Sequence, residues 1–187
     1  MKDNENFIDL AFKGGSDGRR DSQSGWQVYI GQYYKNKKII DIGSGLGNSR
    51  PRLSVNDNEV TLQEPAPELQ ADIKEELAEI PSDSYEIVTC FDVIEHIPDD
   101  STFLKDLFRV CKNTVFMTTP NFRVFGCKNK YHIREYTPPE LVELCEDFSS
   151  NLEFLVCNNT TGAGCFKVDR KTFLESNAPA LAVFLHK

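Results

Sequence analysis

The sequence lacks long apolar runs and an apolar N-terminus. No stretch of the chain approaches the roughly 18 apolar residues that a membrane-spanning helix needs, which excludes an integral membrane protein of the helical kind. Residues 1–6 read MKDNEN and contain no apolar core of the kind that a signal peptide carries. We therefore expect a cytoplasmic protein with no membrane among its partners.

Cysteine pairs with metal-site spacing are also missing. The six cysteines include no C-x-x-C pair and lie scattered among apolar segments. Because no export signal is expected, buried free thiols are favoured over disulfides or a zinc site. The six are Cys90, Cys111, Cys127, Cys145, Cys157 and Cys165.

Net positive charge is missing as well. The 29 Asp and Glu residues outnumber the 21 Lys and Arg residues, which gives a formal net charge of −8. A general nucleic-acid binder usually carries a basic surface, so this balance counts against one. A local basic patch stays open, because Arg123, Lys128, Lys130 and Arg134 gather in one predicted loop.

What is present indicates one domain of the α/β class. The length of 187 residues and the apolar content of 40% suit a single globular core. Residues 1–25 are polar and interrupted by glycine, so we expect a mobile N-terminal arm and one domain over 26–187. The patterns predict a helix at 26–34, a helix capped at 99–101 that runs to 111, a helix from 137 through 144, and strands at 39–42, 60–62, 85–91, 115–119, 152–157 and 180–185.

The chain is organised around residues 39–48, IIDIGSGLGN. The apolar run predicts a buried strand, and three glycines spaced two apart follow it. Glycine permits positive φ and lets a ligand approach the main chain, as at the nucleotide sites of open α/β sheets. Asp41, two residues before the first glycine, suits a cationic ligand and opposes a pyrophosphate. Glu64, an acid about 20 residues beyond the loop, suits the two hydroxyls of a ribose.

These residues carry a resemblance to a known family. The stretch DIGSGLG at 41–47 resembles the first motif of the class I S-adenosylmethionine-dependent methyltransferases. Three later phrases, FDVIEHI at 91–97, TPN at 119–121 and HIREYT at 132–137, resemble a large branch of that family. That branch acts on small molecules, sugars, lipids and some RNAs.

The resemblance implies a Rossmann-like fold with a mostly parallel central sheet and an antiparallel last strand. Residues 65–73 leave little room for the usual second helix and third strand, so we expect a compressed region there. The implied cofactor is S-adenosyl-L-methionine. The implied cofactor-binding residues are Asp41, Gly43, Ser44, Gly45, Gly47, Glu64, Asp72, Ile73, Phe91 and Asp92.

Individual roles also follow from the resemblance. The glycine loop with Ser44 would pass under the amino-acid part of the cofactor, and Asp41 would meet its ammonium directly or through water. Glu64 would meet the ribose. Asp72 and Ile73 resemble the acid-plus-apolar pair of the family, in which the carboxylate meets the adenine amino group.

A polar cluster follows the strand at 85–91. Asp92, Glu95 and His96 stand at i, i+3 and i+4, so one helical turn would project all three to one face, with His132 approaching from across the cleft. Quinone-precursor O-methyltransferases and small-RNA 2′-O-methyltransferases have a similar cluster that binds metal, although Asp92 is shorter than their usual Glu. Local bracing is preferred here over a divalent cation on these four residues, and His96 as general base is a further option. The catalytic candidates are His96, His132 and Glu95.

The predicted function is transfer of a methyl group to an oxygen or nitrogen of a small acceptor. The acceptor is expected to be anionic, such as a nucleotide-linked sugar or an acidic metabolite, because the loops hold Arg123, Lys128, Lys130, Arg134, Lys167, Arg170 and Lys171. Three alternatives stay open: a metal-dependent methyltransferase of RNA 3′ ends, a non-catalytic cofactor binder, and a nicotinamide-dependent oxidoreductase. The oligomeric state is left open.

Overall fold

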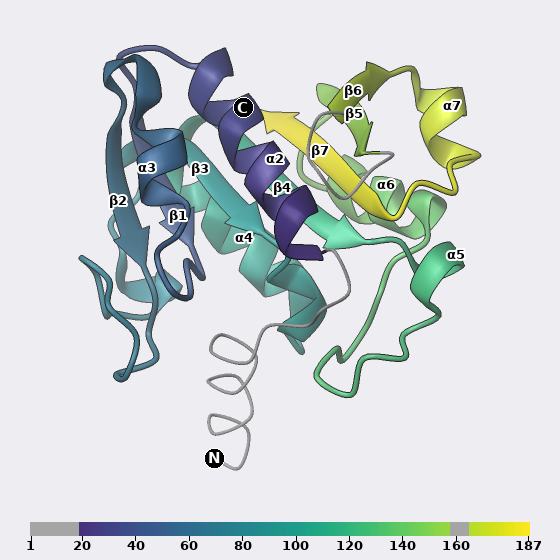
Figure 1. Cartoon of the computed structure of the whole chain (residues 1–187), viewed down its shortest axis with the longest axis horizontal. Helices are drawn as coiled ribbons and strands as arrows, with labels where there is room; N and C mark the ends of the chain where they lie inside the picture. The colour runs from purple at the N-terminus through teal and green to yellow at the C-terminus, as the bar shows by residue number, and fades with distance from the viewer. Residues whose placement is uncertain (1–18, 158–164) are drawn as a thin grey trace.

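The fold is described from a computed structural model over residues 19–157 and 165–187. A seven-stranded sheet runs through it in the order β2-β1-β3-β4-β7-β5-β6 (Figure 1). The strands are β1 Lys38–Ile42, β2 Glu59–Gln63, β3 Tyr85–Phe91, β4 Cys111–Pro120, β5 Leu152–Cys157, β6 Cys165–Val168 and β7 Ala180–His186.

Helices join these strands and cover the sheet. They are α2 Arg19–Tyr33, α3 Arg50–Leu53, α4 Asp100–Val110, α5 Phe122–Phe125, α6 Pro138–Glu146 and α7 Arg170–Leu174, with short 3-10 turns at Val55–Asp57, Leu77–Glu79 and Ile94–His96. None of the helices in the described ranges combines the length and the apolar character needed to cross a membrane.

The sheet has the predicted mixture of strand directions. Strands β2, β1, β3 and β4 pair in parallel, whereas β7 runs antiparallel to both of its neighbours, β4 and β5. The expected α/β, Rossmann-like sheet with an antiparallel last strand is therefore confirmed. An additional antiparallel strand, β6, pairs with β5 at the edge and was not predicted.

Successive strand residues serve two separate cores, because their side chains alternate between the faces of the sheet. Ile40 belongs to the core under α4, α6 and α7, where Leu104, Leu141 and Phe173 pack. Its neighbour Ile39 belongs to the core on the other face, under α2 and α3. The result is a sheet between two helical layers, with α2 crossing in front of it in Figure 1.

The region after β2 is compressed, as expected. In place of a full third strand, a single parallel bridge joins Gln63 to Ile73. Only the 3-10 turn at Leu77–Glu79 follows before β3 begins. Arg109 of α4 closes this segment, since its guanidinium donates to the carbonyl oxygens of Leu77 and Ile80.

Two predicted boundaries are wrong. The helix expected at 26–34 begins at Arg19, so the arm expected over 1–25 ends too late, and its residues 1–18 lie outside the described ranges. Trp26 and Ile30 on this helix are fully buried in the core on that face of the sheet, as expected for a packed helix. The loop expected between the last two strands contains β6 and α7, and residues 158–164 within it are also outside the described ranges.

Parallel pairing brings the carboxyl ends of three strands to one edge of the sheet. Ile42 lies opposite Cys90, and Phe91 lies opposite Thr118. The loops that follow β1, β3 and β4 therefore emerge side by side, which is where open α/β sheets bind their ligands.

Candidate active site at the carboxyl edge of the sheet

The glycine loop after β1 depends on glycine at three positions. Gly43, Gly45 and Gly47 have φ of +66°, +54° and +71°, a left-handed region that other residues rarely adopt. A Cβ at Gly43 would lie 2.7 Å from Val93 Cγ2, and one at Gly47 would lie 2.9 Å from Leu62 Cδ1. A Cβ at Gly45 would meet no heavy atom within 4 Å. Gly45 therefore faces open space, and a side chain there would fill it.

Two polar residues adjoin Gly45: Ser44 precedes it in the chain, and Glu64 accepts from its amide. The buried Oγ of Ser44 has no hydrogen-bond partner within the described residues. Glu64 is also buried, and its carboxylate accepts from the amides of Gly45 at 3.0 Å and Ala66 at 3.1 Å. Because buried polar groups are almost always paired, an orphaned hydroxyl beside an open space indicates a place for a polar ligand.

Asp41 lies beneath the loop and is buried. Its carboxylate accepts hydrogen bonds from Ser49 Oγ and from Thr89 Oγ1, the latter at 2.8 Å. Burial raises the pKa of Asp41 to about 6, although these two hydrogen bonds act against the shift. The negative charge of Glu64 raises it further. The carboxylate is ionised at neutral pH and loses its charge as the pH falls below about 6.

Asp72 is already engaged by the protein. Its carboxylate pairs with the guanidinium of Arg50 and accepts from the amide of Leu62 at 2.8 Å. Partial burial opposes its ionisation, but the hydrogen bonds from Leu62 and Arg50 outweigh burial and lower the pKa of Asp72. Asp72 thus ties the helix α3 to the compressed segment, next to Ile73. Its predicted contact with adenine stays a prediction.

The placement expected for Asp92 is wrong. Asp92 has φ of +53°, and the 3-10 turn that carries Glu95 and His96 begins only at Ile94. Asp92 therefore precedes the turn and does not share one helical face with Glu95 and His96, although its charge still acts on Glu95. Its oxygens accept instead from Thr118 Oγ1 at 2.6 Å and from Gln23 Nε2 at 2.9 Å.

Phe91, the residue before Asp92, serves the core. It is 7% exposed, and its ring centroid lies 5.8 Å from that of Phe116.

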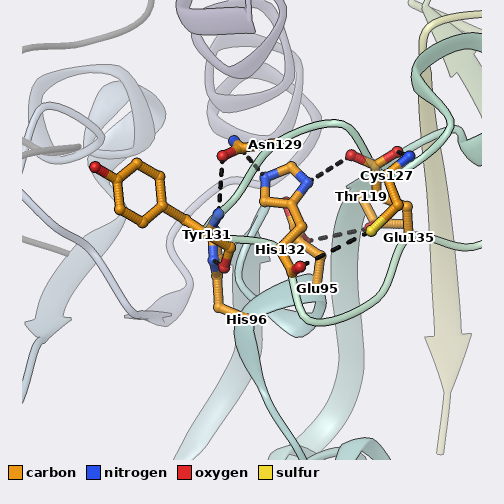
Figure 2. A network of polar contacts seen from close by, with 8 residues as sticks. All are labelled: Glu95, His96, Thr119, Cys127, Asn129, Tyr131, His132 and Glu135. Atoms are coloured by element: carbon orange, nitrogen blue, oxygen red, sulfur yellow. Dashed lines mark hydrogen bonds and ion pairs between the residues drawn. The ribbon is translucent and has the colours of Figure 1, made fainter. Parts of the chain in front are cut away.

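Three of the four clustered residues do come together. Ligand atoms of Glu95, His96 and His132 all lie within 4.8 Å of one another. The two imidazole rings meet edge to face, with their centroids 4.9 Å apart (Figure 2). The loop after β4 therefore delivers His132 to the turn after β3, as the sequence predicted.

The hydrogen bond of His96 identifies its tautomer. Nδ1 lies 2.8 Å from the carbonyl oxygen of Tyr131, and a carbonyl can only accept. His96 therefore carries a proton on Nδ1, and in the neutral ring the lone pair is on Nε2.

His132 has partners on both ring nitrogens (Figure 2). Nδ1 lies 2.6 Å from a carboxylate oxygen of Glu135, and Nε2 lies 3.0 Å from the amide nitrogen of Asn129. The side-chain oxygen of Asn129 accepts from the amide of Tyr131 at 3.1 Å, which fixes the amide so that its NH₂ group donates to His132. Glu135 and Asn129 thus hold the ring as Nδ1–H.

Glu95 braces the same loop. Its carbonyl oxygen accepts from the amides of Ile133 at 2.9 Å and Arg134 at 3.2 Å. Burial raises the pKa of Glu95 well above its usual range, and the negative charge of Asp92 adds to this, against a hydrogen bond from Thr119. Glu95 thus ties the turn after β3 to the loop after β4 through its backbone carbonyl, while its carboxyl group accepts from Thr119.

A surface pocket of about 480 Å³ lies at α5, in the loop that also carries His132. It is lined by residues 122–126 with Lys128, Thr137 and Asn177. Phe122 and Val124 are each 42% exposed, which gives the pocket an apolar floor. The amide of Cys127, between Gly126 and Lys128, donates to Glu135 at 3.0 Å, so the pocket wall is joined to the residue that orients His132.

Most of the predicted basic residues are already paired. Arg134 pairs with Asp100, Lys167 with Glu153 and Arg170 with Glu146. Arg123 donates to the carbonyl oxygen of Leu174. Four of the seven basic side chains that suggested an anionic acceptor thus have partners within the protein, and the anionic acceptor stays a prediction.

Two basic residues remain near the pocket. Lys128 and Lys130 are exposed, and the ammonium of Lys130 lies 4.7 Å from the Tyr131 ring centroid.

Several residues of the site were missed in the sequence. Gln23, Thr89 and Thr118 come from distant elements, and nothing in their local pattern distinguishes them. Glu135 and Asn129 could have been found, because each stands three residues from His132 in a loop already singled out.

Comparisons with known proteins identify the family and the fold of the chain. The methyltransferase domain family matches residues 28–148. A probable S-adenosylmethionine-dependent methyltransferase of Mycolicibacterium smegmatis is 34% identical over 81 residues, which are 40% of this chain and 32% of that protein. The match thus spans about a third of the length of this curated relative.

Solved structures share the fold at low identity. A SAM-dependent methyltransferase from Archaeoglobus fulgidus has a TM-score of 0.67 at 18% identity, covering 98% of this chain and 99% of that one. The small RNA methyltransferase HEN1 has a TM-score of 0.64 at 14% identity, covering 88% of this chain and 24% of that one. Since the family match extends over more than half of the sequence, the chain belongs to the methyltransferase domain family.

Proposed function

We propose that this protein binds S-adenosyl-L-methionine and transfers its methyl group to an oxygen or nitrogen of a small anionic acceptor. The observation that carries the proposal is the open space at Gly45. It is bordered by the orphaned Ser44 hydroxyl, by the Glu64 carboxylate and, beneath, by the buried Asp41. Membership in the methyltransferase domain family gives this arrangement its chemical meaning.

The donor set fits the cofactor at each charged or polar group. The ionised Asp41 would attract the ammonium of the amino-acid part, and the amides and Ser44 hydroxyl of the glycine loop would meet its carboxylate. Glu64 would accept from the ribose hydroxyls, exchanging its present bond to Gly45 for them. The carboxylate of Asp41 at the end of β1 disfavours a pyrophosphate, which argues against a nicotinamide cofactor.

For methyl transfer, the main task of the protein is to orient the methyl donor and the acceptor. S-adenosyl-L-methionine supplies an electrophilic methyl group on a sulfonium sulfur. His96 is placed to take the proton of the acceptor through Nε2, since Tyr131 holds Nδ1 protonated. His132, fixed by Glu135 and Asn129, supports His96 by edge-to-face contact.

The pocket beside α5 is the proposed place for the body of the acceptor. Phe122 and Val124 offer apolar contact, and Lys128 offers a positive charge on an otherwise acidic protein. An acceptor with a negatively charged group on a partly apolar body matches this combination.

A metal-dependent RNA methyltransferase is the second candidate. The grouping of Glu95, His96 and His132 and the fold shared with HEN1 favour it. The arrangement does not fit a cation as it stands. Burial and the neighbouring Asp92 disfavour the charged form of Glu95, and His132 Nε2 would have to release Asn129. We therefore derive no step through a metal.

Two measurements test the proposed function. Calorimetry with S-adenosyl-L-methionine should give binding, whereas NADH under the same conditions should give none. Incubation with labelled cofactor, separately with neutral acceptors, anionic acceptors and short RNA, should then label an anionic small molecule. Binding of the cofactor with no labelled product in any arm would favour the non-catalytic alternative.

A further inference from the structure

Two cysteines at the edge of the sheet face each other. Cys157, the last residue of β5, is the register partner of Cys165, the first residue of β6. A side-chain hydrogen bond joins the two thiols. Two independent features, backbone register and side-chain contact, thus bring these sulfur atoms together.

The backbone geometry permits a bond between them. Directly opposed residues of antiparallel strands have Cα atoms about 4.5 or 5.5 Å apart, depending on the type of pair. Disulfides span Cα separations of about 4.4–6.8 Å, so no strand has to move far. The Cβ atoms of directly opposed residues are about 4.5–5.5 Å apart, slightly more than the about 3.5–4.5 Å found in relaxed disulfides. A disulfide at this position would therefore be strained, and strained disulfides are easily reduced.

The two thiols differ in access. Cys157 is fully buried in the core under α2, whereas Cys165 is half-buried and packs against that core. The hydrogen bond from Cys157, together with burial, raises the pKa of Cys165. The thiolate is therefore scarce at neutral pH, so oxidation will be slow and will accelerate as the pH rises.

We propose that Cys157 and Cys165 are a modification site at which a peroxide forms a reversible disulfide. The sulfur of Cys165 attacks one peroxide oxygen, the O–O bond breaks, and a sulfenic acid and one water are formed. The thiol of Cys157 then attacks this sulfur and releases the second water. Two thiols lose two electrons and two protons in all, and hydrogen peroxide is reduced to two waters.

The site lies on the side of the sheet that carries the proposed active site. Cys157 is paired with Ala180 of β7, and Ala180 with Pro120 of β4, immediately before Asn121 and α5. Figure 1 shows β5 and β6 together at this end of β7. Oxidation would fix the edge strand β6 to β5 beside the pocket loop. The proposal does not depend on the methyl-transfer reaction.

Thiol counting on the whole folded chain tests the proposal. The protein is exposed to hydrogen peroxide at pH 8, quenched with catalase, denatured in N-ethylmaleimide, digested and analysed by mass spectrometry. Wild-type protein should fall from six labelled cysteines to four, with one tryptic peptide, residues 135–167, in which Cys157 and Cys165 are unlabelled and which is lighter by two hydrogens than the same peptide with free thiols. Dithiothreitol should restore six.

Matched variants distinguish this pair from general oxidation. Cys157→Ser and Cys165→Ser should give no internally linked peptide, whereas Cys145→Ser, which removes a buried thiol on α6, should give the same internal link as wild type. Circular dichroism confirms that each variant is folded. Retention of six labelled thiols, a link between other cysteines, or sulfinic acid at Cys165 without a link would overturn the proposal.

Discussion

The carboxylate of Glu64 accepts a hydrogen bond from the amide of Gly45 at 3.0 Å, which ties the end of β2 to the glycine loop after β1. The same two residues border the proposed cofactor site. Glu64 lies on one side of it, and the missing side chain of Gly45 leaves the space itself. Substitution of Gly45 therefore tests the backbone and the open space, and substitution of Glu64 tests the carboxylate.

Gly45→Ala should weaken binding of S-adenosyl-L-methionine. The added Cβ enters the open space, and the left-handed backbone costs about 1–2 kcal/mol with any side chain. Gly126→Ala is the matched control, because Gly126 has φ of +62° and its Cβ would approach only Lys128, at 4.0 Å. Calorimetry should show at least tenfold weaker binding for Gly45→Ala and unchanged affinity for Gly126→Ala. Equal losses in both variants would mean that backbone strain, not the cofactor space, is responsible.

Glu64→Ala should weaken binding by about 1–3 kcal/mol, because the ribose hydroxyls lose a buried acceptor. Glu140→Ala serves as control, since Glu140 also accepts from a backbone amide, that of Thr137 at 2.8 Å, but caps α6. Both variants should lower the unfolding midpoint, and only Glu64→Ala should lower affinity in calorimetry. Unchanged affinity in Glu64→Ala would remove Glu64 from the cofactor site.

Cofactor binding should depend on pH through Asp41. Its pKa of about 6 lies above the usual value, so the carboxyl takes up a proton as the pH falls through 6 and its attraction for an ammonium is lost. Affinity should therefore fall about tenfold between pH 7 and pH 5. Asp41→Asn should remove this dependence and bind weakly at both values. A wild-type affinity that is flat over this range would contradict a contact between Asp41 and the ammonium.

The parts of the fold that could be predicted from the sequence are those set by local pattern. Strand β3 was placed at its observed bounds, because a continuous apolar run between a turn and a polar cluster admits few other structures. The helix predicted from 137 is α6, and its start is set by a local capping box of Thr137 and Glu140. The three glycines predicted a loop of positive φ, which the structure has.

The rest depends on contacts between distant residues. The left-handed Asp92 is held by Thr118 and Gln23, which lie 26 and 69 residues away, so helical spacing alone misplaced its side chain. Likewise, Asp72 pairs with Arg50, 22 residues away, and no local pattern reveals that its carboxylate is engaged. Residue types near a site are readable from sequence, whereas the direction of each side chain is settled by its partners.

His96→Ala should reduce the rate of methyl transfer by about 10²–10⁴-fold, the usual contribution of a general base, with cofactor affinity unchanged. His186→Ala is the control, because His186 contacts Thr114 on β4 and lies outside the active site. A chelator should leave wild-type activity intact. If activity vanishes with chelator and returns with Mg²⁺ or Mn²⁺, the metal-dependent alternative is correct and the base assignment is wrong.

Reversing the charge of Lys128 and Lys130 should weaken recognition of an anionic acceptor. The double variant Lys128→Glu, Lys130→Glu places two carboxylates beside the pocket at Phe122 and Val124, where they repel an anion. We expect the KM of the best anionic acceptor to rise about tenfold, equivalent to about 1.4 kcal/mol, with kcat little changed. A neutral acceptor should keep its KM.

Lys105→Glu controls for this experiment, because Lys105 is exposed on α4, away from the pocket. It makes the same kind of charge change as either substitution in the pocket but should leave both acceptors unaffected. Calorimetry with the cofactor should give wild-type affinity in all variants, which separates acceptor recognition from the glycine loop. If the anionic acceptor is turned over equally well by the double variant, the pocket does not bind its charge.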